Sequence, residues 1–119
     1  MDEKNLVIAG SRGFDNYLLL CTEVSAYIKD VENVKIVTGC ARGVDYMATM
    51  YARAHSIAYE VHEADWTKYG KSAGPIRNRE MAKKAHAGLI FWNGKSKGTR
   101  NMIEELRKQG VAPIKIIYF

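Results

Sequence analysis

The sequence predicts a single α/β domain over residues 1–119, in which helices cover both faces of a mainly parallel five-stranded sheet. Short apolar runs alternate with segments of helical periodicity along the whole chain. This alternation is typical of strand–helix–strand units that build a three-layer sandwich. The hydrophobic and charged fractions, 47% and 26%, are those of an ordinary globular protein, and 119 residues suffice for one core.

The apolar runs predict the strands. The first, residues 5–9 (NLVIA), has no polar alternation, which indicates a strand buried on both faces of the sheet. The second is residues 33–38 (NVKIVT), and a break containing glycine follows each of these two runs. Three more strands are predicted at residues 58–62, 88–92 and 114–119.

Helical patterns separate these runs. We expect the first helix to begin after an N-cap at Asp15 and to end near residue 29. Its expected apolar face consists of Leu18, Leu20, Val24, Tyr27 and Ile28. The second helix is expected to end near residue 55, with an apolar side made of Val44, Met47, Ala48, Tyr51 and Ala52.

The longest segment without a recognisable pattern is residues 63–74 (EADWTKYGKSAG). A third helix is predicted from residue 75 to about residue 85, because Pro75 lacks an N–H and fits the first turn of a helix. A fourth helix is predicted for residues 99–109. Gly110 follows it and Pro113 lies beyond, as is typical of a helix C-terminus.

Cations follow the ends of the predicted strands. Arg12 and Arg42 come after the first and second strands, whereas Arg77 and then Lys95 and Lys97 follow the third and fourth. Ligands of parallel α/β sheets bind at the carboxyl ends of the strands, where the strand order reverses. We therefore expect these cations to lie along one edge of the sheet and to form one site.

The strongest candidate for a binding loop is residues 91–99 (FWNGKSKGT), which lead from an apolar strand into a helix. Glycine-rich loops in this position present backbone N–H groups to anions. Cations are unusual there, because a helix N-terminus carries partial positive charge and favours acidic residues. The loop therefore predicts a phosphate site formed by Gly94, Lys95, Ser96, Lys97, Gly98 and Thr99, with Arg100 nearby.

Two other breaks, GSRG and GCARGVD, supply further candidate contacts. These contacts are Gly10, Ser11, Arg12, Gly39, Arg42, Gly43 and Asp45. GSRG is either a phosphate-approach loop or only a tight turn. Asp45 either complements the helix dipole or bonds to a ribose or to Arg42. Neither break has the spacing of the dinucleotide-binding G-x-G-x-x-G fingerprint or of a Walker loop.

The segment GPIRN adds Arg77 and Asn78 as candidate contacts. We expect Arg77 and Arg79 in the first turn of the third helix, where arginine forms bidentate hydrogen bonds with phosphate. The alternative is an ion pair between Arg77 and a neighbouring acid such as Asp65 or Glu80.

The patternless segment before this helix contains Asp65, Trp66 and Tyr69 and has two interpretations. In the first interpretation, the segment closes over the site, and Trp66 or Tyr69 stacks on a base. Alternatively, the same aromatic rings anchor the segment to the body of the protein.

The charge is unevenly distributed along the chain. Residues 1–60 contain six Lys or Arg and eight Asp or Glu, whereas residues 61–119 contain twelve and five. A basic half suggests phosphate-bearing partners, either small nucleotides or nucleic acid. A solvated lysine-rich surface is the alternative.

Other function classes have little support in the sequence. No apolar run approaches the length of a membrane span, and the acidic start of the chain does not resemble a signal peptide. Cys21 and Cys40 form no metal or disulfide pattern, which favours free thiols and a cytoplasmic location. The three histidines have no metal-ligand spacing, so we expect no metal and no cofactor.

Four blocks of sequence together resemble the SLOG superfamily, in its YspA/YpsA-related branch. The blocks are VIAGSRGFDNY, VTGCARGVDYMATMYA, ADWTKYGKSAGPIRNREM and FWNGKSKGTRNMI. The resemblance covers nearly the whole chain. It implies a Rossmann-like domain that binds nucleotides or nucleotide-derived ligands such as ADP-ribose-like molecules. It also implies a phosphate motif at residues 94–99, a ligand-contacting arginine at Arg77, and a homodimer, because relatives often dimerise.

A related branch, similar to the "lonely guy" phosphoribohydrolases, carries a motif P-G-G-x-G-T-x-x-E with a catalytic glutamate. Lys97-Gly98-Thr99 matches the middle of that motif, but the glutamate position falls on Met102. Glu104 and Glu105 lie further along the helix and point elsewhere. The absence of a glutamate at position 102 argues against hydrolysis, but it does not affect the expected phosphate binding.

These inferences lead to one expected function and two alternatives. We expect a binding protein for a nucleotide or nucleotide-derived molecule, with a sensing, sequestering or regulatory role. The first alternative is an N-glycosidase that uses other acids, such as Asp45, Glu63 or Asp65. The second alternative is a nucleic-acid-binding protein, like the DNA-processing relatives of the superfamily.

Overall fold

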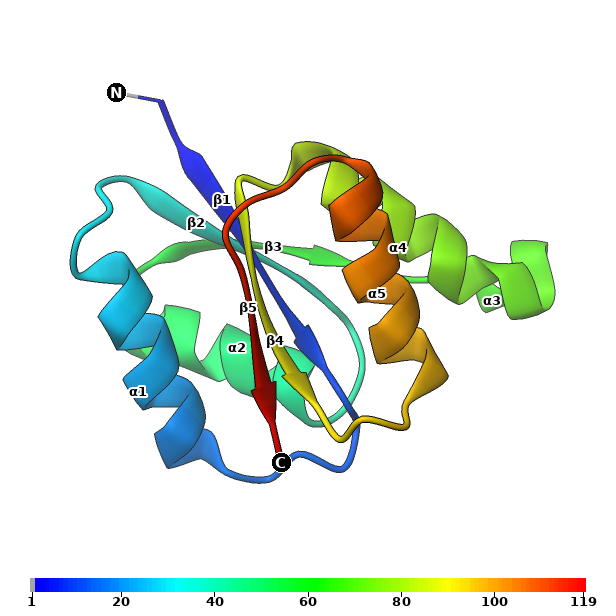
Figure 1. Ribbon diagram of the computed structural model, residues 1–119, viewed down its shortest axis with the longest axis horizontal. Helices are drawn as coiled ribbons and strands as arrows, with labels where there is room; N and C mark the ends of the chain where they lie inside the picture. Colours follow the sequence, from blue (N-terminus) through cyan, green and yellow to red (C-terminus); the bar gives the residue numbers. More distant parts are fainter. Residues whose placement is uncertain (1) are drawn as a thin grey trace.

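The strands of the computed structural model, which describes residues 2–119, form one sheet in the order β3-β2-β1-β4-β5 (Figure 1). All neighbouring strands in it are parallel. The strands are β1 (Lys4–Gly10), β2 (Val34–Gly39), β3 (Ala58–His62), β4 (Ala87–Trp92) and β5 (Ile114–Tyr118). The predicted parallel sheet is confirmed, and each predicted strand end is correct to within one residue.

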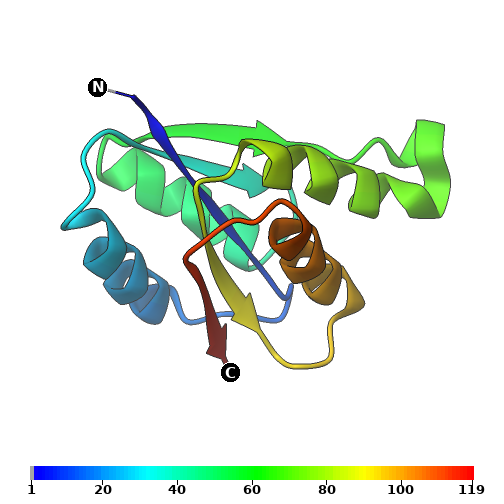
Figure 2. The same ribbon diagram turned by 45° about the horizontal axis from the view of Figure 1, so that its top comes forward.

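Helices cover both faces of the sheet, as predicted. The helices are α1 (Tyr17–Ile28), α2 (Val44–Ala54), α3 (Trp66–Tyr69), α4 (Ala73–Lys84) and α5 (Lys97–Lys108), with a 3₁₀ turn at Gly70–Ser72. Figure 2 shows α1 and α2 on one side of the sheet and α4 and α5 on the other. The result is a three-layer α/β sandwich.

The central strand β1 contributes to the core on both faces. Leu6 and Ile8 pack with α1 and α2, whereas Val7 and Ala9 pack with α4 and α5. Successive side chains of a strand point to opposite faces, so an apolar run without alternation fills both cores. This burial holds the carboxyl end of β1 at the centre of the sheet edge.

The prediction of an irregular segment at residues 63–74 was wrong. Asp65 caps α3, where its carboxylate accepts the backbone N–H of Lys68 at 3.0 Å, and α4 begins at Ala73, before Pro75. A single helical turn is too short to show periodicity in a sequence. Because α4 begins early, Arg77 and Arg79 lie in its second turn and not in the first.

Two other helix starts differ from the prediction. Asn16, and not Asp15, caps α1: its side-chain oxygen accepts the N–H of Leu19 at 3.0 Å. Within the expected apolar face of α1, Leu20 and Val24 are buried but Leu18 is 77% exposed. Ser96 caps α5, so that helix begins at Lys97 and not at residue 99, which places Met102 in its second turn.

None of the helices in residues 2–119 is both long enough and apolar enough to cross a membrane. The same part of the chain contains no group of three or more His, Cys, Asp or Glu side chains arranged to hold a metal ion. Cys21 and Cys40 are free thiols.

Candidate functional site

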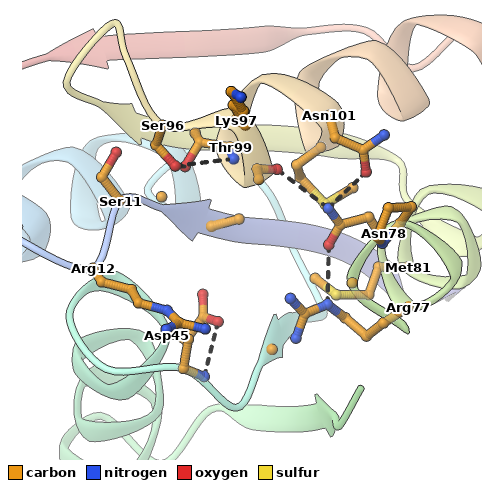
Figure 3. A pocket seen from close by; sticks show the side chains of 18 of the residues that line it. Ser11, Arg12, Asp45, Arg77, Asn78, Met81, Ser96, Lys97, Thr99 and Asn101 are labelled. Atoms are coloured by element: carbon orange, nitrogen blue, oxygen red, sulfur yellow. Dashed lines mark hydrogen bonds between the residues drawn. The ribbon is translucent and has the colours of Figure 1, made fainter. Parts of the chain in front are cut away.

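A cavity of about 600 Å³ lies at the carboxyl edge of the sheet (Figure 3). It is bounded by the segments after β1, β2 and β4 and by the starts of α4 and α5. The chain goes from β1 outward to β2 and β3, and returns to the other side of β1 for β4. The cavity therefore occupies the position where α/β sheets bind their ligands.

The structure brings most of the candidate residues together around this cavity. Those that line it are Gly10, Ser11, Arg12, Gly39, Asp45, Trp66, Arg77, Asn78, Ser96, Lys97, Gly98 and Thr99. The candidates that do not line it are Arg42, Gly43, Asp65, Gly94 and Lys95. Two of these have structural positions instead: Gly43 starts α2 with a positive φ of 77°, and Asp65 caps α3.

Other lining residues were not among the candidates. They are Ala9, Gly13, Ala41, Lys71, Gly74, Pro75, Met81, Asn93, Asn101 and Met102. Asn93 directly follows β4, so its position at a strand end was a usable signal. Met81 and Asn101 lie inside helices, and only the packing of α4 against α5 brings them to the cavity.

Arg77 presents its charge to the cavity. Its Nε donates to Asn78 Oδ1 at 3.0 Å and its Nη1 donates to the carbonyl of His62 at 3.4 Å. Within residues 2–119 it forms no ion pair, neither with Asp65 nor with Glu80. The guanidinium is thus oriented by neutral groups, and its charge remains available to an anion.

Asn78 fixes Arg77 relative to the start of α5. The side chain is buried, and its Nδ2 donates to the carbonyl of Gly98 at 3.3 Å and to Asn101 Oδ1 at 2.9 Å. The same side chain accepts from Arg77 through its oxygen. One side-chain amide therefore separates the guanidinium from the N-terminal turn of α5.

Asp45 supplies a buried carboxylate to the cavity wall, with only 6% of the residue exposed. Its Oδ1 accepts from the hydroxyl of Thr38 at 3.3 Å, and its Oδ2 accepts from the N–H of Ala41 at 3.2 Å. Burial raises the pKa of this carboxyl, and the Ala41 N–H and the charge of Arg77 oppose part of the rise. Among the interactions of the described residues, none joins Asp45 to Arg42.

The loop before α5 satisfies several of its own N–H groups. Asn93 Oδ1 accepts from the N–H of Lys95 and of Ser96, both at 2.9 Å. Ser96 Oγ accepts from the N–H of Thr99 at 3.3 Å. Among the described residues, the N–H groups of Lys97 and Gly98 have no partner, and both residues line the cavity.

The aromatic residues near the site have different surroundings. Trp66 is 53% exposed and lines the cavity at its rim. Tyr69 does not line it, and Lys68 lies 5.1 Å from the centre of its ring. The guanidinium of Arg100 lies 5.6 Å from the centre of the Trp92 ring, so this cation is directed away from the cavity.

This chain is similar in sequence to a known family and to a known phage protein. The model of the YspA, cpYpsA-related SLOG family matches residues 5–69. Gene 61 protein of Mycobacterium phage D29 is 39% identical over 85 residues, which cover 66% of this chain and 68% of that protein.

A solved structure shares the fold. The X-ray structure of DNA processing protein A (DprA) from Streptococcus pneumoniae superposes with a TM-score of 0.74 and 18% identity. The match covers 96% of this chain and 50% of that one, so this chain spans half the length of that protein. At this identity the likeness shows the Rossmann-like fold alone.

Proposed function

This chain belongs to the YspA, cpYpsA-related SLOG family, and on that premise we propose that its cavity binds a nucleotide or a nucleotide-derived small molecule. SLOG domains bind ligands of this class. The proposed role is sensing, sequestering or regulation, in which binding itself is the activity.

The observation that carries the proposal is the excess of positive charge in the cavity. Among the described residues, the basic side chains that line it are Arg12, Lys71, Arg77 and Lys97, against one acid, Asp45. Figure 3 places Lys97 and the start of α5 on one side of the end of β1, with Arg12 and Arg77 on the other. The charge of Asp45 offsets only part of this excess, and the remaining positive charge favours an anionic ligand.

The first turn of α5 is the proposed phosphate site. The N–H groups of Lys97 and Gly98 lack partners, and the helix dipole adds partial positive charge there. Thr99, whose N–H is bonded to Ser96, contributes less than the sequence alone suggested. Asn78, which bonds to Arg77 and to the carbonyl of Gly98, links this turn to the guanidinium.

The remaining walls suit a nucleoside. Ala9, Met81 and Met102 form an apolar floor, and Trp66 stands at the rim, where an indole ring can stack on a base. The carboxylate of Asp45 can accept a ribose hydroxyl, as acidic residues do in dinucleotide-binding folds. A volume of about 600 Å³ is within the usual range for ligand sites.

The same geometry favours binding over glycosidic cleavage. Met102 lines the cavity where a catalytic carboxylate would be needed, and a thioether can neither transfer a proton nor stabilise a cationic transition state. Asp65 lies outside the cavity wall and caps α3. Asp45, the acid on the wall, is held by Thr38 and Ala41, and the role proposed for its carboxylate is to accept a ribose hydroxyl.

A thermal-shift screen followed by calorimetry tests the proposal. The panel is AMP, ADP, ADP-ribose, NAD, cyclic nucleotides and a single-stranded oligonucleotide. A ligand that binds the native state raises its apparent stability, so at least one nucleotide should raise the melting temperature. If only the oligonucleotide binds, with steep salt dependence, the protein is a nucleic-acid-binding protein instead.

A further inference from the structure

The segment between β3 and α4 contributes no side chain to the core. Residues 65–72, which include α3 and the 3₁₀ turn, are all exposed, whereas Ala73 and Gly74 directly after them are buried. We call residues 65–72 the flap. Both overall views show α3 projecting past the end of β3, with α4 beside it (Figures 1 and 2). The flap is therefore held at its two ends and is otherwise uncovered.

The hydrogen bonds of the flap are local. Asp65 accepts from the N–H of Lys68 through its side chain and from the N–H of Tyr69 through its carbonyl, both at 3.0 Å. Among the interactions of residues 2–119, no hydrogen bond or ion pair joins the flap to the sheet or to α5. A segment with exposed backbone hydrogen bonds and few buried apolar contacts moves at a low cost in free energy.

Gly70 provides a hinge between α3 and the 3₁₀ turn. Its φ is 56°, in the left-handed region that glycine adopts without strain, and a Cβ built on it would meet no heavy atom within 4 Å. These surroundings leave room for α3 to change its angle to α4. Lids of ligand sites commonly turn on a few such residues at the ends of their elements.

Two side chains of the flap already lie at the cavity. Trp66 and Lys71 line its wall, although Trp66 is 53% exposed and no ion pair within residues 2–119 includes Lys71. A ligand favours a closed arrangement only through contacts that are better in that arrangement. An indole ring that covers a nucleoside and an ammonium group that reaches a phosphate are contacts of this kind.

We propose that the flap is a lid that closes over the cavity when a nucleotide binds, by rotation of α3 about Gly70. In the closed state Trp66 covers the nucleoside and Lys71 contacts the phosphates. Closure converts occupancy of the cavity into a change at the molecular surface, as a sensing role requires. This inference rests on the proposed function, because the nucleotide supplies the contacts that hold the lid closed.

Amide exchange measured by NMR for each residue, with and without ADP, tests the lid. The N–H groups of Lys68 and Tyr69 are the reporters, because both are bonded within the flap and neither residue lines the cavity. A closed flap opens less often, so the exchange of both should slow by about tenfold or more. Residues 29–33, which precede β2 at the opposite edge of the sheet, should exchange at an unchanged rate.

Arg77→Ala is the control for occupancy, at an ADP concentration that fills most of the unmodified protein and little of the variant. Its flap should exchange as it does without ADP. If calorimetry shows that ADP binds but only Trp66 and Lys71 exchange more slowly, the ligand touches an unmoved flap, and the lid is overturned while the proposed function stands. If ADP does not bind at all, the proposed phosphate site fails and the lid fails with it.

Discussion

Asp45 and Arg77 both approach the position that a Cβ would occupy on Gly39, without forming an ion pair with each other. A Cβ built on Gly39 would lie 2.6 Å from Asp45 Oδ2 and 2.5 Å from Arg77 Nη1. Each charged group is held by its own neutral partners, Asp45 by Thr38 and Ala41 and Arg77 by Asn78. The glycine therefore keeps space for a carboxylate and a guanidinium in one cavity wall.

Gly39→Ala should weaken nucleotide binding at least tenfold, because the added methyl group displaces Arg77 or Asp45. Both are side chains that can move, and Gly39 does not have a positive φ, so the domain should still fold. Calorimetry measures the affinity, and circular dichroism checks the fold. If the effect acts through Arg77, the double variant Gly39→Ala, Arg77→Ala should bind no more weakly than Arg77→Ala alone.

Arg77→Ala should cost roughly 1.5–3 kcal/mol of binding free energy, which is typical of hydrogen bonds to charged groups. Lys83→Ala is the matched control, because this exposed cation lies on the same helix but outside the cavity. The control should change the affinity little. Equal losses in both variants would indicate a diffuse basic surface and would favour nucleic acid as the ligand.

The protein should release no appreciable free base from AMP, GMP, CMP or UMP. Glycosidic cleavage passes through an oxocarbenium-like state that needs a nearby carboxylate, and Met102 occupies that position. Chromatography of the incubated nucleotides measures the release, with Met102→Glu assayed in parallel. Rapid release by the unmodified protein that Asp45→Asn or Asp65→Asn abolishes would show a relocated catalytic acid.

Glu60 should make the stability of the domain depend on pH. Its carboxylate accepts from Lys84 Nζ at 2.6 Å and contacts His62, and these interactions lower its pKa from 4.5 to about 2. Because the pKa is lower in the folded state, the stabilisation is complete above about pH 4.5 and is lost as the pH falls toward 2. Glu60→Gln should therefore destabilise the domain more at pH 7 than at pH 3.

Urea unfolding at pH 7, 5 and 3 measures this difference. Glu104→Gln, an exposed change on α5, is the matched control. A Glu60→Gln effect of the same size at all three pH values would show that its interactions with Lys84 and His62 do not contribute to folding.

The strands were predictable because β1 and β4 are buried on both faces, which leaves unbroken apolar runs in the sequence. The predicted helix starts were less accurate, because adjacent residues can be equally good N-caps. Asn16 caps α1, although the neighbouring Asp15 is chemically similar. Ser96 likewise caps α5, which begins at Lys97, two residues before the predicted start.

The candidate site was predictable where a residue ends a strand, as Gly10 and Gly39 do, or directly follows one, as Ser11 does. Lys71, Met81 and Asn101 were not predictable, because they reach the cavity only through the positions of the 3₁₀ turn, α4 and α5. The sequence also did not indicate which backbone N–H groups of the loop are already hydrogen-bonded. The N–H of Lys95 donates to the side chain of Asn93 and that of Thr99 donates to the side chain of Ser96, and both bonds depend on side-chain geometry.

A crystal structure of the protein with ADP bound tests the proposed phosphate site most directly. We expect a phosphate group about 2.7–3.2 Å from the backbone nitrogens of Lys97 and Gly98, with Arg77 in contact with the phosphate chain. A nucleotide bound elsewhere on the protein, with the N-terminal turn of α5 unoccupied, would contradict this expectation.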